Sequence, residues 1–158
     1  MQQIHSSIDI DAPDHLVWAI LTDFGSYEQW NPYIRAVLGK PSAGNMMQIA
    51  LRGQRRAIAS MGSLLTRARE PCELRWRKRT FAPGLYTTEH RIRIEALPSG
   101  GVRFHQIELI KGLFASFLGR GGQRATEEGF HAMNHALKAR AEGMYEGLVA
   151  AGKPALSS

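Results

Sequence analysis

The stretch Gln123–Leu148, QRATEEGFHAMNHALKARAEGMYEGL, contains no proline and decides the fold. Its apolar residues recur at steps of three and four, as on one face of a helix; they are Phe130, Met133, Leu137, Ala141, Met144 and Leu148. At 1.5 Å per residue this helix is expected to be about 39 Å long. An apolar face of that length needs a large partner, and we expect it to lie in a curved β-sheet.

The rest of the chain predicts mostly strands. Gln2–Ile10 alternates polar and apolar residues, as a half-buried strand does. Asp11 and Pro13 then favour a helix start, with Pro13 in the first turn and Asp11 as a capping acceptor. This short helix ends near Asp23, and Ser26–Trp30 predicts one further helical turn.

Six more strand-like segments follow, separated by short connections rich in glycine and proline. They are Ile34–Lys40, Met46–Arg52, Ile58–Glu70, Glu73–Thr80, Tyr86–Leu97 and Val102–Lys111. Short connections favour antiparallel pairing. We therefore expect an α+β fold with about seven strands, two short helices after the first strand, and the long helix last. Residues 1–150 form one domain in this interpretation, Gly119–Gly122 is a flexible connector, and 151–158 is a flexible tail.

Charge and cysteine content narrow the function classes. Twenty basic residues against fourteen acidic ones give a net charge of +6 over 158 residues. Much of the excess alternates along one strand, at Arg75, Arg77 and Arg79, as on a solvated sheet face. No nucleic-acid-binding motif is present, so we expect no nucleic-acid partner. A single cysteine, Cys72, with no signal peptide and no membrane-spanning apolar run, predicts a cytoplasmic protein.

Several short motifs resemble the START-like (SRPBCC) superfamily, in particular its polyketide cyclase/dehydrase and lipid-transport branch. They include Ile10-Asp-Ala-Pro13, Leu21-Thr22-Asp23-Phe24, Trp30-Asn31-Pro32-Tyr33 and Phe130-His-Ala-Met-Asn134. The resemblance implies a helix-grip fold with a cavity between sheet and long helix that holds an apolar or amphipathic small molecule. Members include cyclases, lipid carriers, hormone receptors and chaperone activators, so the resemblance does not select one function.

Strand alternation predicts which side chains face the long helix. In Tyr86–Leu97 the charged set faces water, which turns His90 and Thr88 inward. The same argument turns Leu74, Trp76 and Lys78 inward from Glu73–Thr80. In Val102–Lys111 the inward set is Val102, Phe104, Gln106, Glu108 and Ile110, and a slip of one residue would reverse it.

His90, Gln106 and Glu108 therefore share one wall of the expected cavity. An imidazole beside a carboxylate can act as a general base, and His90 and Glu108 are the candidate catalytic residues. The alternative is a polar cluster that only fixes the core.

The candidate ligand-binding residues line this wall, the loop at its end, and the facing helix. Phe81–Tyr86 bears proline and glycine, as a lid at a cavity mouth does, or forms an ordinary turn. Trp30 and Trp76 are either cavity walls or plain core. The full set is Trp30, Tyr33, Trp76, Phe81, Leu85, Tyr86, Thr88, His90, Phe104, Gln106, Glu108, Phe130, Asn134 and Leu137.

Metal and cofactor signals are weak. Glu127, His131 and His135 are spaced four apart on one helix face but lack the further ligands of a known zinc motif, so we expect exposed surface there and no metal site. We expect no cofactor.

Three hypotheses remain. The first is a protein that binds a hydrophobic small molecule, lipid-like or polyketide-like. The second is a cofactor-free cyclase, aromatase or dehydratase that uses His90 with Glu108. The third is a chaperone-activator-like interaction module that uses the basic outer sheet face. Monomer and homodimer are both open.

Overall fold

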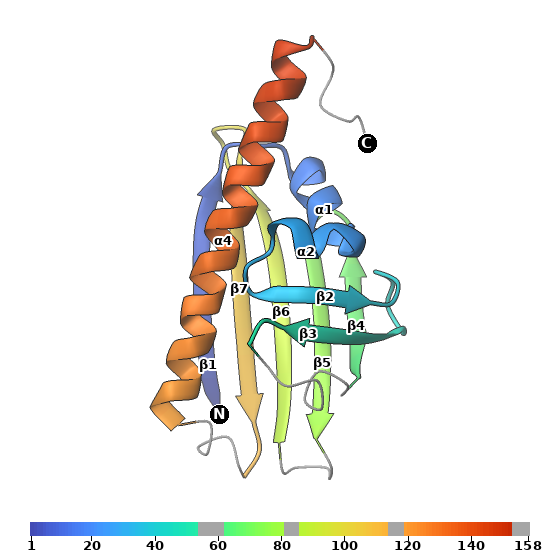
Figure 1. Cartoon of the computed structure of the whole chain (residues 1–158), viewed down its shortest axis with the longest axis vertical. Helices are drawn as coiled ribbons and strands as arrows, with labels where there is room; N and C mark the ends of the chain where they lie inside the picture. Colours follow the sequence, from blue (N-terminus) through green and yellow to red (C-terminus); the bar gives the residue numbers. More distant parts are fainter. Residues whose placement is uncertain (54–61, 81–85, 114–118, 153–158) are drawn as a thin grey trace.

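The computed structural model describes residues 1–53, 62–80, 86–113 and 119–152. Among these residues, a strand and three short helical segments, one of them a 3-10 turn, come first, six strands follow, and a long helix comes last (Figure 1). In chain order the elements are β1 (Gln2–Ile10), α1 (Asp14–Thr22), the 3-10 turn η1 (Phe24–Ser26), α2 (Tyr27–Trp30), β2 (Ile34–Leu38), β3 (Met46–Leu51), β4 (Ser63–Arg69), β5 (Glu73–Thr80), β6 (Tyr86–Ala96), β7 (Val102–Lys111) and α4 (Gly119–Ala150).

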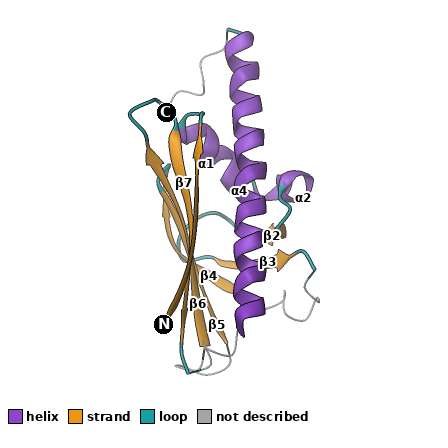
Figure 2. Cartoon of the chain, turned by 90° about the vertical axis from the view of Figure 1, so that its left-hand side faces the viewer, coloured by secondary structure: helices purple, strands orange, loops and turns teal. Residues whose placement is uncertain are grey.

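The strands form one antiparallel sheet in the order β1-β7-β6-β5-β4-β3-β2. Among the described residues, β3 pairs with β4 at Met46↔Leu64 and Met47↔Ser63, and the β2–β3 hairpin crosses the direction of the other strands (Figure 1). Figure 2 shows most of the sheet as one layer with α4 alongside it, whereas β2 and β3 extend out of that layer. The predicted helix-grip fold, a curved sheet around a long C-terminal helix, is confirmed.

α4 runs alongside β1 in the same direction, so the two rise together from one end of the molecule (Figure 1). Asn134 donates to Ser6, and Lys138 donates to the carbonyl of Asp9. We call the end where β1 and α4 begin the lower end.

The described residues form a core of two apolar clusters. The larger one joins α1, the upper sheet and the middle of α4, and it includes Leu16, Phe104 and Leu137. The smaller one, at the lower end, is formed by Ile4, Ile110 and Phe130, with Tyr33 and Tyr86 packed against it. Trp18 of α1 is 6% exposed and also belongs to the larger cluster.

Some local predictions were wrong. Residues 119–122 belong to α4 instead of a flexible connector, because the helix begins at Gly119. Pro13 is the N-cap residue of α1, and no side chain caps that helix. Asp11 instead donates its backbone N–H to Glu142. β4 begins at Ser63; residues 58–61 of the predicted strand lie outside the described residues, as do 153–158 of the predicted tail.

The outer sheet face is less solvated than expected. Glu89 is only 8% exposed, because Arg77 and Arg91 donate hydrogen bonds to its carboxylate and Arg75 lies within ion-pair distance. Glu73 pairs in the same way with Arg67 and Arg75. Much of the basic charge on this face is thus balanced within the sheet. In the part of the chain that is described, no helix is long and apolar enough to cross a membrane.

Candidate ligand-binding site

Polar side chains gather on the inner sheet face between the two apolar clusters. Strand register places Glu108 opposite His90, and His90 opposite Trp76, in one row that begins at Ile4. The row above it, in the same register, contains Ser6, Gln106, Ile92 and Leu74. The row below it contains Gln2, Ile110, Thr88 and Lys78. Alternation therefore predicted the inward face of β6 and β7 correctly.

His90 is the centre of this region. Its side chain is 6% exposed, and Nδ1 lies 2.9 Å from a carboxylate oxygen of Glu108. The imidazole stacks on Trp76, with ring centroids 4.4 Å apart, and meets the Phe130 ring edge-on at 5.0 Å. The other nitrogen, Nε2, is buried and has no hydrogen-bond partner among the described residues. The ring is thus fixed on three sides with one polar atom unused.

Tyr33 reaches the same region from the loop before β2. Its ring meets Phe130 edge-on, with centroids 5.8 Å apart. A Cβ on Gly129 would lie 2.2 Å from this ring, so glycine at that position is what lets Tyr33 touch the helix. Burial, followed by the negative charge of Glu108, raises the pKa of Tyr33 to about 12, although a hydrogen bond with Thr126 lowers it. Tyr33 therefore stays a neutral phenol at neutral pH.

Two further titratable groups lie near Glu108. Burial lowers the pKa of the Lys78 amine, while the negative charge of Glu108 raises it. Burial and the same carboxylate raise the pKa of Tyr86. Glu108 is thus a shared electrostatic partner for the polar groups at the lower end. Alternation predicted that Lys78 points inward, but the predicted site did not include it. Its position on β5, two residues after Trp76, could have indicated that it lies near the site.

Gln106 and Asn134 connect the sheet to the helix. The Gln106 amide donates to Asn134 Oδ1 at 2.7 Å and to the Phe130 carbonyl at 3.4 Å. Asn134 in turn donates to Ser6 Oγ at 3.0 Å. All three side chains are buried, and Gln106 Oε1 has no partner among the described residues. This chain of hydrogen bonds fixes α4 to β1 and β7 directly beside His90.

The remaining predicted site residues lie in different surroundings. Phe104 lies on β7 one row above Gln106, and Leu137 lies on α4. Both are fully buried in the larger cluster. Trp30 packs against the same cluster and meets the Tyr27 ring edge-on at 5.2 Å. Thr88 is half-buried, one row below His90. Phe81 and Leu85, with the predicted lid, lie outside the described residues.

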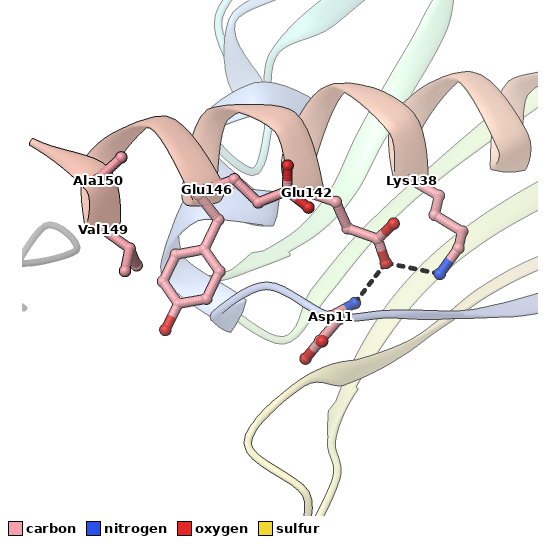
Figure 3. A pocket seen from close by; sticks show the side chains of 7 residues that line it. Asp11, Lys138, Glu142, Glu146, Val149 and Ala150 are labelled. Atoms are coloured by element: carbon pink, nitrogen blue, oxygen red, sulfur yellow. Dashed lines mark hydrogen bonds and ion pairs between the residues drawn. The ribbon is translucent and has the colours of Figure 1, made fainter.

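A hollow of about 590 Å³ lies elsewhere, under the upper part of α4 (Figure 3). It is lined by Asp11, Lys138, Glu142, Tyr145, Glu146, Val149 and Ala150, none of which belongs to the predicted site. Glu142 projects from α4 and accepts hydrogen bonds from Lys138 and from the Asp11 backbone N–H. We interpret this group as a clamp that holds α4 to the end of β1. Within the described ranges no three or more His, Cys, Asp or Glu side chains are arranged to hold a metal ion.

Comparison with known proteins identifies a family for the chain and neighbours for its fold. The family model described as polyketide cyclase/dehydrase and lipid transport matches residues 1–142. No curated protein sequence matches the chain. A START superfamily protein from Mycobacterium smegmatis is 16% identical, with a TM-score of 0.64 over 90% of this chain and 98% of that one.

Two other solved structures show how widely the fold is shared. The di-domain ARO/CYC BexL of the BE-7585A biosynthetic pathway is 16% identical with a TM-score of 0.67; the match covers 89% of this chain and 50% of that one. Ara h 8.0201 is 10% identical with a TM-score of 0.66, over 90% of this chain and 98% of that one. At these identities the likeness shows the fold alone.

Proposed function

Because the chain belongs to the polyketide cyclase/dehydrase and lipid-transport family, we propose that it binds an apolar or amphipathic small molecule between α4 and the lower half of the sheet. Trp76 and Phe130 supply aromatic walls, and Tyr33 and Tyr86 supply amphipathic ones. His90 and Glu108 form the polar anchor. Phe81 and Leu85, which lie outside the described residues, remain part of the proposed site.

The observation that carries this proposal is the unused Nε2 atom of His90. A buried polar atom without a partner costs about 1–3 kcal/mol, and native proteins satisfy nearly all such atoms. Here the atom lies in an aromatic frame whose other contacts are complete. A ligand or a water molecule that bonds to Nε2 removes this cost.

A second function, catalysis by proton transfer, is favoured by the same pair. A base needs a free lone pair and a partner that fixes its orientation. Glu108 holds Nδ1 of His90, which leaves Nε2 available to accept a proton from a bound molecule. The charged imidazole would then be stabilised by Glu108. Such a cofactor-free step suits the cyclase, aromatase and dehydratase alternative, with His90 as base and Glu108 as its orienting partner.

The binding proposal is tested with a neutral apolar fluorophore, N-phenyl-1-naphthylamine. We expect saturable binding with one site per chain. Thr88→Trp places a bulky ring in the inner row below His90, whereas Thr87→Trp places the same ring on the outer face, beside Arg77 and Lys111. Thr88→Trp should abolish binding and Thr87→Trp should preserve it. Absence of saturable binding, or equal loss in both variants, contradicts the proposal.

A further inference from the structure

We propose that the outer face of the sheet carries a second binding site, which takes a small organic phosphate monoester. The site is a shallow hollow of about 230 Å³ over β5, β6 and β7. Its lining residues are Arg77, Thr87, Glu89, Leu109 and Lys111. The sheet separates this hollow from the proposed site beneath α4, and the two share no residue. The inference therefore stands or falls independently of the proposed function.

Paired strands fix how the lining side chains lie. Thr87 of β6 is opposite Lys111 of β7. In the next row, Glu89 of β6 lies between Leu109 of β7 and Arg77 of β5. Because alternate residues of a strand point to the same face, all five side chains project from the outer face. The hollow is thus built on three hydrogen-bonded strands, which hold its donors in place before a ligand binds.

Arg77 presents unused hydrogen-bond donors at this hollow. Its Nε and Nη2 atoms lie 3.3 and 2.7 Å from the same carboxylate oxygen of Glu89. A guanidinium group has five N–H bonds. The contact with Glu89 leaves both hydrogens of Nη1 without a partner among the described residues, and the side chain is 41% exposed. Glu89 therefore holds the guanidinium in one orientation while its remaining donors stay accessible to an anion.

Positive charge exceeds negative charge around the hollow. Four arginine side chains form ion pairs with two carboxylates on this face; they are Arg67, Arg75, Arg77 and Arg91 around Glu73 and Glu89. Arginine keeps its charge at any ordinary pH, so four positive and two negative charges leave an excess of two. Lys111 is exposed at the hollow and has no carboxylate partner among the described residues, which raises the excess to three.

The carboxylate of Glu89 does not need a further partner. Burial raises its pKa, but hydrogen bonds from Arg77 and Arg91 outweigh burial and hold the pKa below its ordinary value of 4.5. One oxygen accepts from Arg77 and the other from Arg91. The negative charge of Glu89 is thus neutralised within the sheet, and the excess positive charge remains for a ligand.

The donors and the charge together favour a phosphate monoester. Arg77 offers the two hydrogens of Nη1, Lys111 offers an ammonium group on a flexible stem, and Thr87 offers a hydroxyl. Three such groups suit the three terminal oxygens of a phosphate monoester. Its charge of about −1.5 to −2 at pH 7 offsets most of the positive excess. A carboxylate has one charge and one oxygen fewer, so it uses the site less well.

An apolar side chain and spare volume indicate the organic part of the ligand. Leu109 lines the hollow and is 8% exposed. A volume of about 230 Å³ corresponds to roughly seven water molecules, at about 30 Å³ each in the liquid. This is more than a phosphate group occupies, and the additional space lies beside Leu109. A compact ring or a short carbon chain attached to the phosphate fits there.

Isothermal titration calorimetry with three probes tests the ligand class. Phenyl phosphate is the monoester, benzoate carries one charge on the same ring, and inorganic phosphate lacks the organic part. At low ionic strength we expect one phenyl phosphate per chain, bound at least about tenfold more tightly than either of the others. Absence of binding, or equal affinity for phenyl phosphate and benzoate, overturns the inference. Inorganic phosphate that binds as tightly as phenyl phosphate overturns the assignment of an organic ligand.

Two tryptophan variants separate the two faces of the sheet. Thr87→Trp fills the outer hollow, so it should abolish binding of phenyl phosphate and preserve binding of N-phenyl-1-naphthylamine. Thr88→Trp, on the inner face, should have the opposite effects. Loss of phenyl phosphate binding in Thr88→Trp alone would place this ligand beneath α4 and overturn the inference. A fluorophore that binds to neither variant nor to the wild type overturns the proposed function alone.

Two lysine variants separate the hollow from the overall charge of the chain. Lys111→Met removes one donor and one charge from the hollow and should weaken phenyl phosphate binding about tenfold. Lys40→Met removes the same charge at an exposed position outside the hollow and should have little effect. Equal weakening by both variants would show that net charge alone attracts the anion, which overturns the inference.

The phosphate monoester has two possible sources, a soluble metabolite or a lipid headgroup. Phosphatidylcholine vesicles with and without phosphatidic acid distinguish them, because phosphatidic acid exposes a phosphate monoester at the membrane surface. Cosedimentation with phosphatidic acid that is lost in Thr87→Trp identifies the lipid source. Binding of phenyl phosphate without cosedimentation identifies the soluble source. Cosedimentation that Thr87→Trp leaves unchanged, without binding of phenyl phosphate, overturns the inference in favour of general electrostatic attraction.

Discussion

The imidazole of His90 lies face to face with the indole of Trp76, with ring centroids 4.4 Å apart and planes within 5°. The two residues are directly opposite each other on β6 and β5. This stacking covers one face of the imidazole and, together with Glu108, stops the ring from turning. The direction of Nε2 is therefore built into the sheet before any ligand arrives.

We predict that Trp76→Ala weakens binding of N-phenyl-1-naphthylamine, because the site then loses an aromatic wall. Trp76→Phe keeps an aromatic face and should retain most of the affinity. Fluorescence titration measures both. Equal affinity in Trp76→Ala and the wild type would show that Trp76 does not line the site.

We predict that alanine substitution has opposite effects on the free energy of unfolding at Gly129 and at Gly143. Gly129→Ala places a methyl group 2.2 Å from the Tyr33 ring, which must move, and we expect a net loss of roughly 1–3 kcal/mol in the free energy of unfolding. Gly143→Ala meets no atom within 4 Å, so helix propensity should stabilise it by up to about 1 kcal/mol. Urea unfolding measures both. Stabilisation by Gly129→Ala would mean that Tyr33 does not pack on α4.

We predict that the contribution of Glu89 to the free energy of unfolding depends on pH. Burial raises its pKa, but hydrogen bonds and positive charge from Arg77 and Arg91 outweigh burial and hold it below the ordinary value of 4.5. Such a group stabilises the folded protein at pH values above its pKa in the unfolded chain. This contribution is lost as the pH falls through its lower pKa in the folded protein. Glu89→Gln should cost roughly 1–3 kcal/mol at pH 7.

The difference between wild type and Glu89→Gln should therefore shrink between pH 7 and pH 3, as measured by urea midpoints. Glu127→Gln, on an exposed part of α4, should show little change at either pH. A difference that stays constant with pH would contradict the ion-pair account of the outer face.

The clamp of Figure 3 predicts local mobility without loss of the fold. Glu142→Ala removes the acceptor for Lys138 and for the Asp11 N–H, so amides of α4 beyond residue 142 should exchange hydrogen faster. Glu146→Ala, in the same hollow and exposed, is the control. Hydrogen exchange with mass spectrometry separates the two; equal exchange in both variants would show that Glu142 does not hold the helix.

Sequence patterns predicted the regular part of this protein well. The bounds of β1, β5 and β7 match those predicted, because clean alternation ends there at turn residues. The inward direction of His90 and Glu108 followed from the same alternation. The glycine-rich segment 119–122 was wrongly predicted to be a flexible connector. It forms the first turn of α4, because local helix propensity is a weak guide within a long helix.

Other features depend on contacts between strands that alternation does not determine. Alternation placed Glu89 on the outer face, but its burial arises from arginines on β5 and β6 that fold over it. Stacking of His90 on Trp76 depends on the register between β5 and β6, and the place of Tyr33 against α4 depends on Gly129. None of these pairs is close in the sequence.

The most direct test of a ligand between sheet and helix compares two adjacent methyl-bearing residues. Ile110 faces α4 in the lower cluster, whereas Leu109 lines the outer face beside Arg77. With methyl-labelled protein and bound N-phenyl-1-naphthylamine, we predict intermolecular nuclear Overhauser effects to Ile110 and none to Leu109. Effects to Leu109 without Ile110 would place the molecule outside the sheet and contradict the account.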